Sequence, residues 1–277
     1  MLKKQWTVGI IGAGVVGTAT GKVFACNEMI YYDKYREGMD DVQLVSKMAE
    51  EADFVFICVP TPMKTSGEID YSAINDSVAL LADAIDGSNS GPVVIIRSTT
   101  VSGTTHDLSI QYPNMRFVFN PEFLVEKTAN SDAMHPKRII IGVDDVDIAL
   151  ALADFYRDAL PGVMVVTVGT RTAEMIKYAS NTFLACQVAV ANELYKICEA
   201  VGVDYDIVRE ALLYDKRIGT HNEVPGPDGE LGFGGKCFPK DLNAAIYFAR
   251  ENGYRPYLLE EVWRLNLRLR EKRDWEG

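Results

Sequence analysis

Short apolar runs alternate with helical patterns over the first 168 residues. The runs Thr7–Ile11, Asp53–Val59 and Val93–Ile96 are almost wholly apolar, as strands buried on both faces of a parallel sheet are. Between such runs the apolar residues recur three and four positions apart, which predicts helices. This alternation predicts an α/β fold with a doubly wound parallel sheet. The other predicted strands are Met29–Tyr32, Arg116–Phe119, Ile139–Val143 and Val163–Val168, and helices are predicted up to Phe24, around Val42–Ala49, and at Ile74–Ile85 and Ile148–Leu160.

The pattern changes after Gly169, where a helical periodicity without Gly or Pro runs from Thr172 to Ala200. We therefore predict a domain boundary there, between residues 1–168 and an all-helical domain of residues 169–277. A helix is predicted at Asp204–Leu213, and two more follow Asp241. The apolar stripes exceed what one short domain covers, which predicts a homodimer. The stripe of the last helix, Pro256–Asp274, consists of Leu258, Leu259, Val262, Leu265 and Leu269.

Composition narrows the class of protein. A hydrophobic fraction of 48% and a charged fraction of 24% are those of an ordered globular protein, and a formal charge of -11 argues against nucleic-acid binding. The five cysteines are scattered, with no CxxC pair and no Cys/His cluster, so neither a disulfide framework nor a metal site is predicted. We find no signal peptide and no apolar run long enough to span a membrane, and we expect a cytoplasmic protein.

The segment Gly12-Ala13-Gly14-Val15-Val16-Gly17 follows a strand and opens a helix. In this context GxGxxG is typical of a Rossmann dinucleotide site, where the glycines allow a tight turn and close approach of a pyrophosphate. Asp33 follows the next strand, where a ribose-binding acid is expected. A carboxylate there favours NAD, although Lys34 and Arg36 leave NADP open.

Polar residues also follow later strands. Thr99 comes after Val93–Ile96 and has either a turn-capping role or one at the nicotinamide end. Asn120-Pro121 has the pattern of a helix start, so Glu122 and Glu126 are expected on one face of a helix near its positive end. There they are either solvated acids or part of a site.

The segment Gly232–Asp241 reads GFGGKCFPKD, and places a thiol beside cations and a carboxylate. Lys236 and Lys240 favour a nucleophilic thiolate at Cys237, although many such cysteines are only structural. On the long helix, Lys177 and Asn181 are four residues apart and face the same way, where they can stabilise an oxyanion or simply face solvent.

GFGGKCFPKD resembles the catalytic loop of the UDP-glucose/GDP-mannose dehydrogenase family, and the other motifs agree with it. These are GxGxxG with Asp33, Val59 to Pro62, Pro-Glu-Phe-Leu-x-Glu at Pro121, Lys177 with Asn181, and Arg-Ile-Gly at Arg217. For NAD the resemblance implies contacts with Gly12, Ala13, Gly14, Val15, Val16, Gly17, Asp33, Val59, Pro60, Thr61, Thr99, Glu126 and Lys240. For the nucleotide sugar it implies Glu122, Phe123, Leu124, Glu126, Lys177, Asn181, Arg217, Phe233 and Gly234.

The resemblance implies a four-electron oxidation of a nucleotide sugar, UDP-glucose foremost, with Cys237, Lys177, Asn181, Asp241, Glu122 and Thr99 as catalytic residues. Water held by Asp241 and Thr99, or Lys177 itself, takes the hydroxyl proton, and Cys237 holds the intermediate. The segment after Asp33 is short for the family, and the chain is expected to lack the C-terminal nucleotide-binding domain. Two alternatives stay open: a single-step 3-hydroxy-acid dehydrogenase, and a truncated, non-catalytic dimer that binds NAD.

Overall fold

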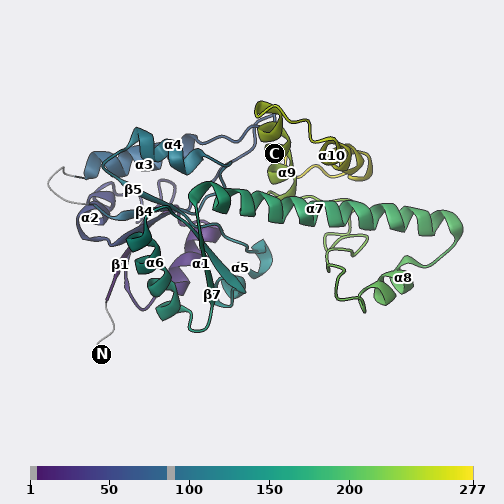
Figure 1. Ribbon diagram of the computed structural model, residues 1–277, viewed down its shortest axis with the longest axis horizontal. Coiled ribbons are helices and arrows are strands. Elements are labelled where there is room, and N and C mark those ends of the chain that lie inside the picture. Colours follow the sequence, from purple (N-terminus) through teal and green to yellow (C-terminus); the bar gives the residue numbers. More distant parts are fainter. Residues whose placement is uncertain (1–4, 86–90, 277) are drawn as a thin grey trace. The chain divides into compact units, whose positions relative to one another are not determined.

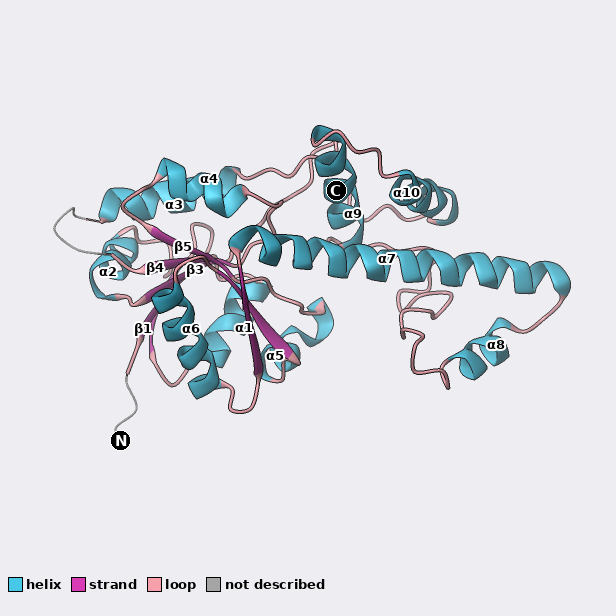
Figure 2. Ribbon diagram, in the orientation of Figure 1, coloured by secondary structure: helices cyan, strands magenta, loops and turns pink. Residues whose placement is uncertain are grey.

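The computed structural model describes residues 5–85 and 91–276. In this part of the chain the elements follow the predicted alternation of strand and helix, and then the change to helices alone (Figures 1 and 2). The strands are β1 (Thr7–Ile11), β2 (Glu28–Tyr32), β3 (Phe54–Ile57), β4 (Val93–Ile96), β5 (Arg116–Phe119), β6 (Arg138–Gly142) and β7 (Met164–Val168). The helices of the first part are α1 (Val15–Val23), α2 (Gln43–Glu51), α3 (Ser72–Ala84), α4 (Thr104–Gln111), the 3-10 turn Glu126–Thr128, α5 (Ala129–Met134) and α6 (Val146–Ala159). The helices of the second part are α7 (Thr170–Val201), α8 (Tyr205–Leu212), α9 (Phe238–Glu251) and α10 (Tyr257–Leu269).

The chain divides into two compact units. The first consists of Met1–Pro62 and Asp70–Lys177, and the second of Met63–Ile69 and Tyr178–Gly277. The predicted single boundary near Gly169 differs from this division in two ways: residues 63–69 belong to the second unit, and the later boundary falls inside α7, after Lys177. The division inside α7 arises because the first two turns of α7 pack on the sheet, with Ala173 fully buried there.

The first unit holds a seven-stranded sheet in the order β2-β1-β3-β4-β5-β6-β7. Helices α1, α5 and α6 bury side chains against one face, and α2, α3 and α4 bury theirs against the other. The strand order reverses between β1 and β3, and ligands of doubly wound sheets bind beyond the carboxyl ends of the strands at such a point. The predicted Rossmann-type fold is therefore confirmed.

One strand pair departs from the predicted parallel sheet. Strands β5 and β6 pair antiparallel, at the single position Phe119 opposite Gly142. Asn120 follows β5 directly and donates from Nδ2 to the carbonyl oxygen of Ile140, 2.7 Å away. A side-chain hydrogen bond thus links the two strands where the backbone ladder is short.

The helix predicted from Pro121 is wrong. Residues 121–125 form an extended loop, and helical turns begin only at Glu126. The reason is tertiary: the Asn120 side chain is fully buried and bonds to Arg97, Tyr156 and the β6 backbone instead of capping a helix. Glu122 and Glu126 therefore do not share a helix face.

The second unit is helical, as predicted. Its core gathers Ala185 and Ala189 of α7, Leu242 and Ile246 of α9, and Val262 of α10. One detail of the predicted α10 stripe is wrong, since Leu258 is 70% exposed. The buried face of α10 instead includes the polar residues Glu260 and Asn266.

Candidate active site

The glycine loop between β1 and α1 has the geometry that a dinucleotide site requires. Gly12 has φ +92°, and a Cβ there would lie 2.8 Å from the carbonyl oxygen of Cys58. A Cβ at Gly17 would collide with the Gly12 carbonyl oxygen, so helix α1 packs against the turn only because Gly17 has no side chain. Nothing lies within 4 Å of a Cβ built on Gly14, which leaves that side of the loop open to a ligand.

Asp33 lies at this loop, as predicted from its spacing. Its Oδ2 accepts a hydrogen bond of 2.7 Å from the amide of Ala13, and its Oδ1 accepts one of 3.0 Å from the amide of Tyr35. The guanidinium of Arg36 is 3.9 Å from Oδ2. The carboxylate is thus fixed beside the glycine turn, at the end of β2.

A pocket of about 610 Å³ opens beside the loop. It joins the start of α1 to the segment that contains Glu126, so the structure brings the predicted cofactor residues Gly14, Val15 and Glu126 together. Arg36, which the sequence analysis placed near the cofactor as a residue that leaves NADP open, also lines this pocket. The remaining lining residues are Thr18, Lys127, Thr128, Ala129, Asn130 and Ser131.

The ends of β3 and β4 meet at the same edge of the sheet. Ser98 donates from its hydroxyl to the carbonyl oxygen of Val59, 2.7 Å away, which ties the predicted Val59–Thr61 segment to the strand end that carries Thr99. Thr61 is buried, whereas Thr99 is half-buried and Pro60 exposed. Cys58 is buried as predicted, and burial raises the pKa of its thiol to about 12, which disfavours the thiolate form.

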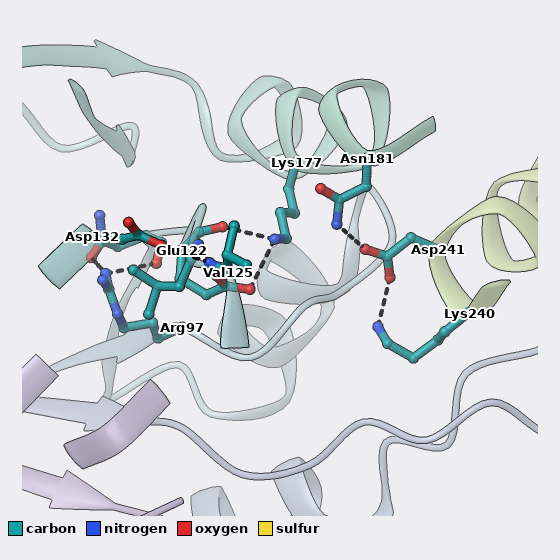
Figure 3. A network of polar contacts seen from close by, with 10 residues as sticks. Arg97, Glu122, Val125, Asp132, Lys177, Asn181, Lys240 and Asp241 are labelled. Carbon is teal, nitrogen blue, oxygen red and sulfur yellow. Dashed lines mark hydrogen bonds and ion pairs between the residues drawn. The ribbon is translucent and has the colours of Figure 1, made fainter. Parts of the chain in front are cut away.

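A buried ion pair joins Lys177 to the loop after β5. Lys177 Nζ donates to the Glu122 carboxylate at 2.8 Å and to the Glu122 carbonyl oxygen at 2.7 Å (Figure 3). The two side chains are 4% and 11% exposed. Glu122 also accepts from the amide of Leu124, and the Phe123 ring lies 5.5 Å from the Lys177 ammonium. Four predicted residues therefore form one cluster.

Glu174 is a buried carboxylate that the sequence analysis did not single out. It accepts hydrogen bonds from the amides of Gly103 and Thr105 and from the hydroxyls of Thr100 and Thr105. Burial raises the pKa of Glu174, against the opposite effect of these donors. The carboxylate fixes the start of α7 to the segment after Thr99. Its signal in the sequence was its place at the start of the segment Glu-Met-Ile-Lys-Tyr-Ala-Ser-Asn, three residues before Lys177.

In the second unit a carboxylate, an amide and an ammonium meet. Asp241 is 1% exposed and accepts hydrogen bonds from Asn181 Nδ2 and from Lys240 Nζ, the latter at 2.6 Å (Figure 3). Cys237 is exposed, is the N-cap of α9, and accepts a backbone hydrogen bond of 2.8 Å from the Asp241 amide. Asn181, Lys240 and Asp241 thus form one cluster, and a backbone hydrogen bond joins Asp241 to Cys237.

Three other predicted substrate residues, Phe233, Gly234 and Arg217, lie elsewhere in this unit. Phe233 is 3% exposed and belongs to the core under the Cys237 loop, and Gly234 is half-buried. Arg217 has an 89% exposed side chain whose Nε bonds to Asp215, and this pairing lowers the pKa of Asp215. The Arg217 guanidinium is therefore held by Asp215 at the surface of this unit.

Two family models match separate parts of the chain. The NAD binding domain of the UDP-glucose/GDP-mannose dehydrogenase family matches residues 33–160, and the central domain of the same family matches residues 171–268. UDP-glucose 6-dehydrogenase AglM of Haloferax volcanii is 31% identical over 303 residues, which cover 94% of this chain and 69% of that protein. The chain belongs to the UDP-glucose/GDP-mannose dehydrogenase family. This confirms the predicted family and the presence of its NAD-binding domain. The chain spans about half to two thirds of the length of the curated relatives it matches.

Solved structures agree on the fold. A UDP-glucose dehydrogenase of Pyrobaculum islandicum has a TM-score of 0.83 and 28% identity, covering 96% of this chain and 69% of that one. The 3-hydroxyisobutyrate dehydrogenase of Mycobacterium tuberculosis has a TM-score of 0.74 at 18% identity, covering 96% and 94%, which shows a shared fold alone. Among the helices in residues 5–85 and 91–276, none has the length and hydrophobicity needed to cross a bilayer. Within those same ranges, no group of three or more His, Cys, Asp or Glu side chains is arranged to hold a metal ion.

Proposed function

We propose that the chain catalyses the NAD-dependent oxidation of a nucleotide sugar from the C6 alcohol to the carboxylate, with UDP-glucose as the substrate. The observation that carries this proposal is the exposed thiol of Cys237 at the N-terminus of α9, one helical turn before the buried carboxylate of Asp241. A helix N-terminus favours the negative charge of a thiolate. A dehydrogenase that stops at a ketone or aldehyde has no use for such a nucleophile.

NAD fits the first unit. The open side of Gly14, the left-handed Gly12 and the carboxylate of Asp33 are what a pyrophosphate and a ribose require. The pocket that Gly14, Val15 and Glu126 line is large enough for part of a dinucleotide. Bound there, NAD would supply the hydride acceptor, with one NAD molecule used in each of the two oxidation steps.

We assign each step of the reaction to side chains of this protein. In the first oxidation a base takes the C6 hydroxyl proton, and we assign this role to water held by the Asp241 carboxylate, because the Lys177 ammonium is already a donor to Glu122. The Cys237 sulfur then adds to the aldehyde carbon, and the carbonyl oxygen becomes an oxyanion. Lys177 and Asn181 both belong to the continuous helix α7, four residues apart, and the side chain of each is a hydrogen-bond donor suited to that oxyanion.

A second oxidation turns the thiohemiacetal into a thioester, which water hydrolyses to the sugar acid and the free thiol. Glu122 would assist that water, since it is the carboxylate that Lys177 holds in place. The acid is released with the four electrons carried away as two NADH.

The reaction can be tested with the purified chain, NAD and a panel of UDP- and GDP-sugars. We expect two NADH per sugar, and an adduct on Cys237 in the intact mass when turnover is stopped part-way. Cys237→Ala should abolish formation of the acid, whereas Cys26→Ala, which changes another exposed cysteine, should not. One NADH per substrate without an adduct would indicate the single-step alternative. Tight NAD binding without turnover on any sugar would indicate a non-catalytic dimer.

We also propose a homodimer formed through the helical unit. Apolar side chains are exposed along α7 and α8, among them Phe183 at 72% and Ile207 at 68%. A surface of this kind is typical of a subunit interface. Light scattering should give twice the chain mass, and Phe183→Asp should lower it; a monomeric wild-type chain would contradict the proposal. The other large exposed apolar side chains of these helices are Val190, Leu194, Ile197 and Val201 in the helical unit and Met175 in the first unit.

A further inference from the structure

The backbone just before Cys237 is held by side chains rather than by regular secondary structure. Residues 232–236 lie in a loop, with Gly232 at φ +70° and Gly235 at φ +73°. Buried peptide groups in such a loop need partners from elsewhere in the fold. The partners here are side chains of α7, of α10 and of the segment that follows α10.

Two buried asparagines supply the central contacts. Asn192 of α7 accepts from the Gly232 amide at 2.9 Å, and its Nδ2 donates to the carbonyl oxygen of Val188. Asn266 of α10 accepts from the Phe233 amide at 2.7 Å and donates to the Phe233 carbonyl oxygen at 2.9 Å. The two asparagines are 2% and 1% exposed. Asparagine is unfavourable inside a helix, so a tertiary contact is the physical reason for both.

The rest of the loop is fixed by Arg270 and Asp274. Asp274 accepts from the Gly235 amide at 3.0 Å, and the buried Arg270 lies between Asp274 and Asp228, 2.6 Å from the latter. A Cβ at Gly234 would collide with the Arg270 guanidinium, and one at Gly232 would collide with Asn266 Oδ1. Gly232 and Gly234 are therefore required because side chains approach their backbone, whereas Gly235 is required for its left-handed φ of +73°.

We infer that Asn192 and Asn266 are positioning residues for Cys237. They fix Gly232 and Phe233, and the Phe233 ring is anchored in the core of the second unit, against residues of α7, α9 and α10. Four residues later the chain enters α9 with Cys237 as its N-cap. If either asparagine is lost, the loop is free to move and the thiol leaves its place at the helix N-terminus. The catalytic consequence rests on the proposed function, but the effect on thiol reactivity does not.

The test compares Asn192→Leu and Asn266→Leu, which remove the hydrogen bonds at similar side-chain volume, with Asn266→Asp, which keeps the acceptor for the Phe233 amide. Asn252→Leu is the matched control, since Asn252 is an exposed asparagine at the end of α9 whose side chain donates to a backbone carbonyl. Iodoacetamide labelling of each cysteine is followed by peptide mass, and Trp263 and Trp275 fluorescence reports whether the second unit is folded.

We expect the labelling rate of Cys237 to fall at least about threefold in both leucine variants and less in Asn266→Asp, with Cys26 unchanged as an internal reference. Turnover should fall at least about tenfold in kcat, with the KM for NAD unchanged. Folded leucine variants that keep the wild-type labelling rate would overturn the inference. If one of the two leucine variants does not fold, the Cys237 labelling rate of the other variant decides the inference. If the wild-type chain turns over no nucleotide sugar, the proposed function fails, while the labelling comparison still decides the positioning role.

Discussion

The buried pair of Lys177 and Glu122 allows a quantitative prediction about the first unit. Lys177→Met keeps the length and the apolar stem of the side chain but removes its charge and its donors. The Glu122 carboxylate, 11% exposed, then keeps only the amide of Leu124 among its hydrogen-bond donors described above. An unpaired carboxylate in a buried site is strongly unfavourable, so the variant should be much less stable than wild type.

The magnitude follows from the geometry. At 2.8 Å and an effective dielectric constant of about 20, the attraction between the charges is about 6 kcal/mol, part of which only offsets the cost of desolvating them. Breaking a buried pair from one side costs about 3–5 kcal/mol. In the double variant Lys177→Met/Glu122→Gln no charge is left buried, and the amide oxygen of Gln can still accept from Leu124. We expect the double variant to recover at least about 2 kcal/mol relative to Lys177→Met.

The assay uses the position of the tryptophans. Trp6 lies in the first unit, 5.1 Å from the Phe54 ring and 5.7 Å from the Phe155 ring, whereas Trp263 and Trp275 lie in the second. In a Trp263→Phe/Trp275→Phe background, the urea-induced change in Trp6 fluorescence therefore reports unfolding of the first unit alone. The control is Lys47→Met, because Lys47 is a 44% exposed lysine that pairs with Glu28 and Glu51 in the same unit. It should cost less than about 1 kcal/mol.

Two results would refute this reasoning. Lys177→Met could prove as stable as Lys47→Met, which would mean that the Glu122 carboxylate reaches solvent or another partner at little cost. The double variant could instead prove as unstable as the single one. In that case the loss would come from the packing of the Lys177 side chain and not from the unpaired charge.

Three further predictions concern the first unit. Burial raises the pKa of Glu174 above its ordinary 4.5, so the stability of wild type relative to Glu174→Gln should be greatest below pH 4.5 and should decline as the pH rises through the raised pKa. Urea unfolding of both proteins at several pH values measures this difference. A relative stability that increases with pH would contradict the prediction. Gly17→Ala should lower the free energy of unfolding by about 1–3 kcal/mol and abolish NAD binding, because the added Cβ would collide with the Gly12 carbonyl oxygen. Calorimetry with NAD measures the binding. Unchanged NAD affinity would show that the loop can shift to accept the Cβ. Asp33→Ala should weaken NAD binding at least about tenfold and reduce the preference for NAD over NADP. The Ala13 amide fixes this carboxylate beside the glycine loop, and we expect it to accept a hydrogen bond of about 1.5–3 kcal/mol from the ribose of NAD. Equal NAD affinity in the variant would place the ribose elsewhere.

Most elements could be predicted from the sequence because their causes are local. Strand β4 and strand β5 have the predicted bounds, and α7 begins two residues earlier and ends one residue later than expected. Apolar runs, helical periodicity and glycine turns act over a few residues, and a single chain displays them without knowledge of the fold. The same holds for the glycine loop and Asp33, whose spacing follows from the strand and helix lengths of one βαβ unit.

The errors lie where a distant residue competes with a local signal. Asn120-Pro121 has every local feature of a helix start, yet Asn120 is buried and bonded to Arg97 and Tyr156, 23 and 36 residues away. Leu258 fits the period of the α10 stripe, but the buried face contains Asn266 instead, because the loop at Phe233 needs a polar partner there. An asparagine on an otherwise apolar helix face was the available signal for that contact.

The sequence by itself determined the two-part architecture, the family and the residue types that can do the chemistry, since motifs and periodicities are short-range properties of the chain. The tertiary structure alone decided which groups meet. Lys177 pairs with Glu122 across 55 residues, Asn181 with Asp241 across 60, and Asn266 with Phe233 across 33. Such pairings depend on how strands and helices pack, because burial leaves each polar group to find a partner among the few that the fold brings within reach.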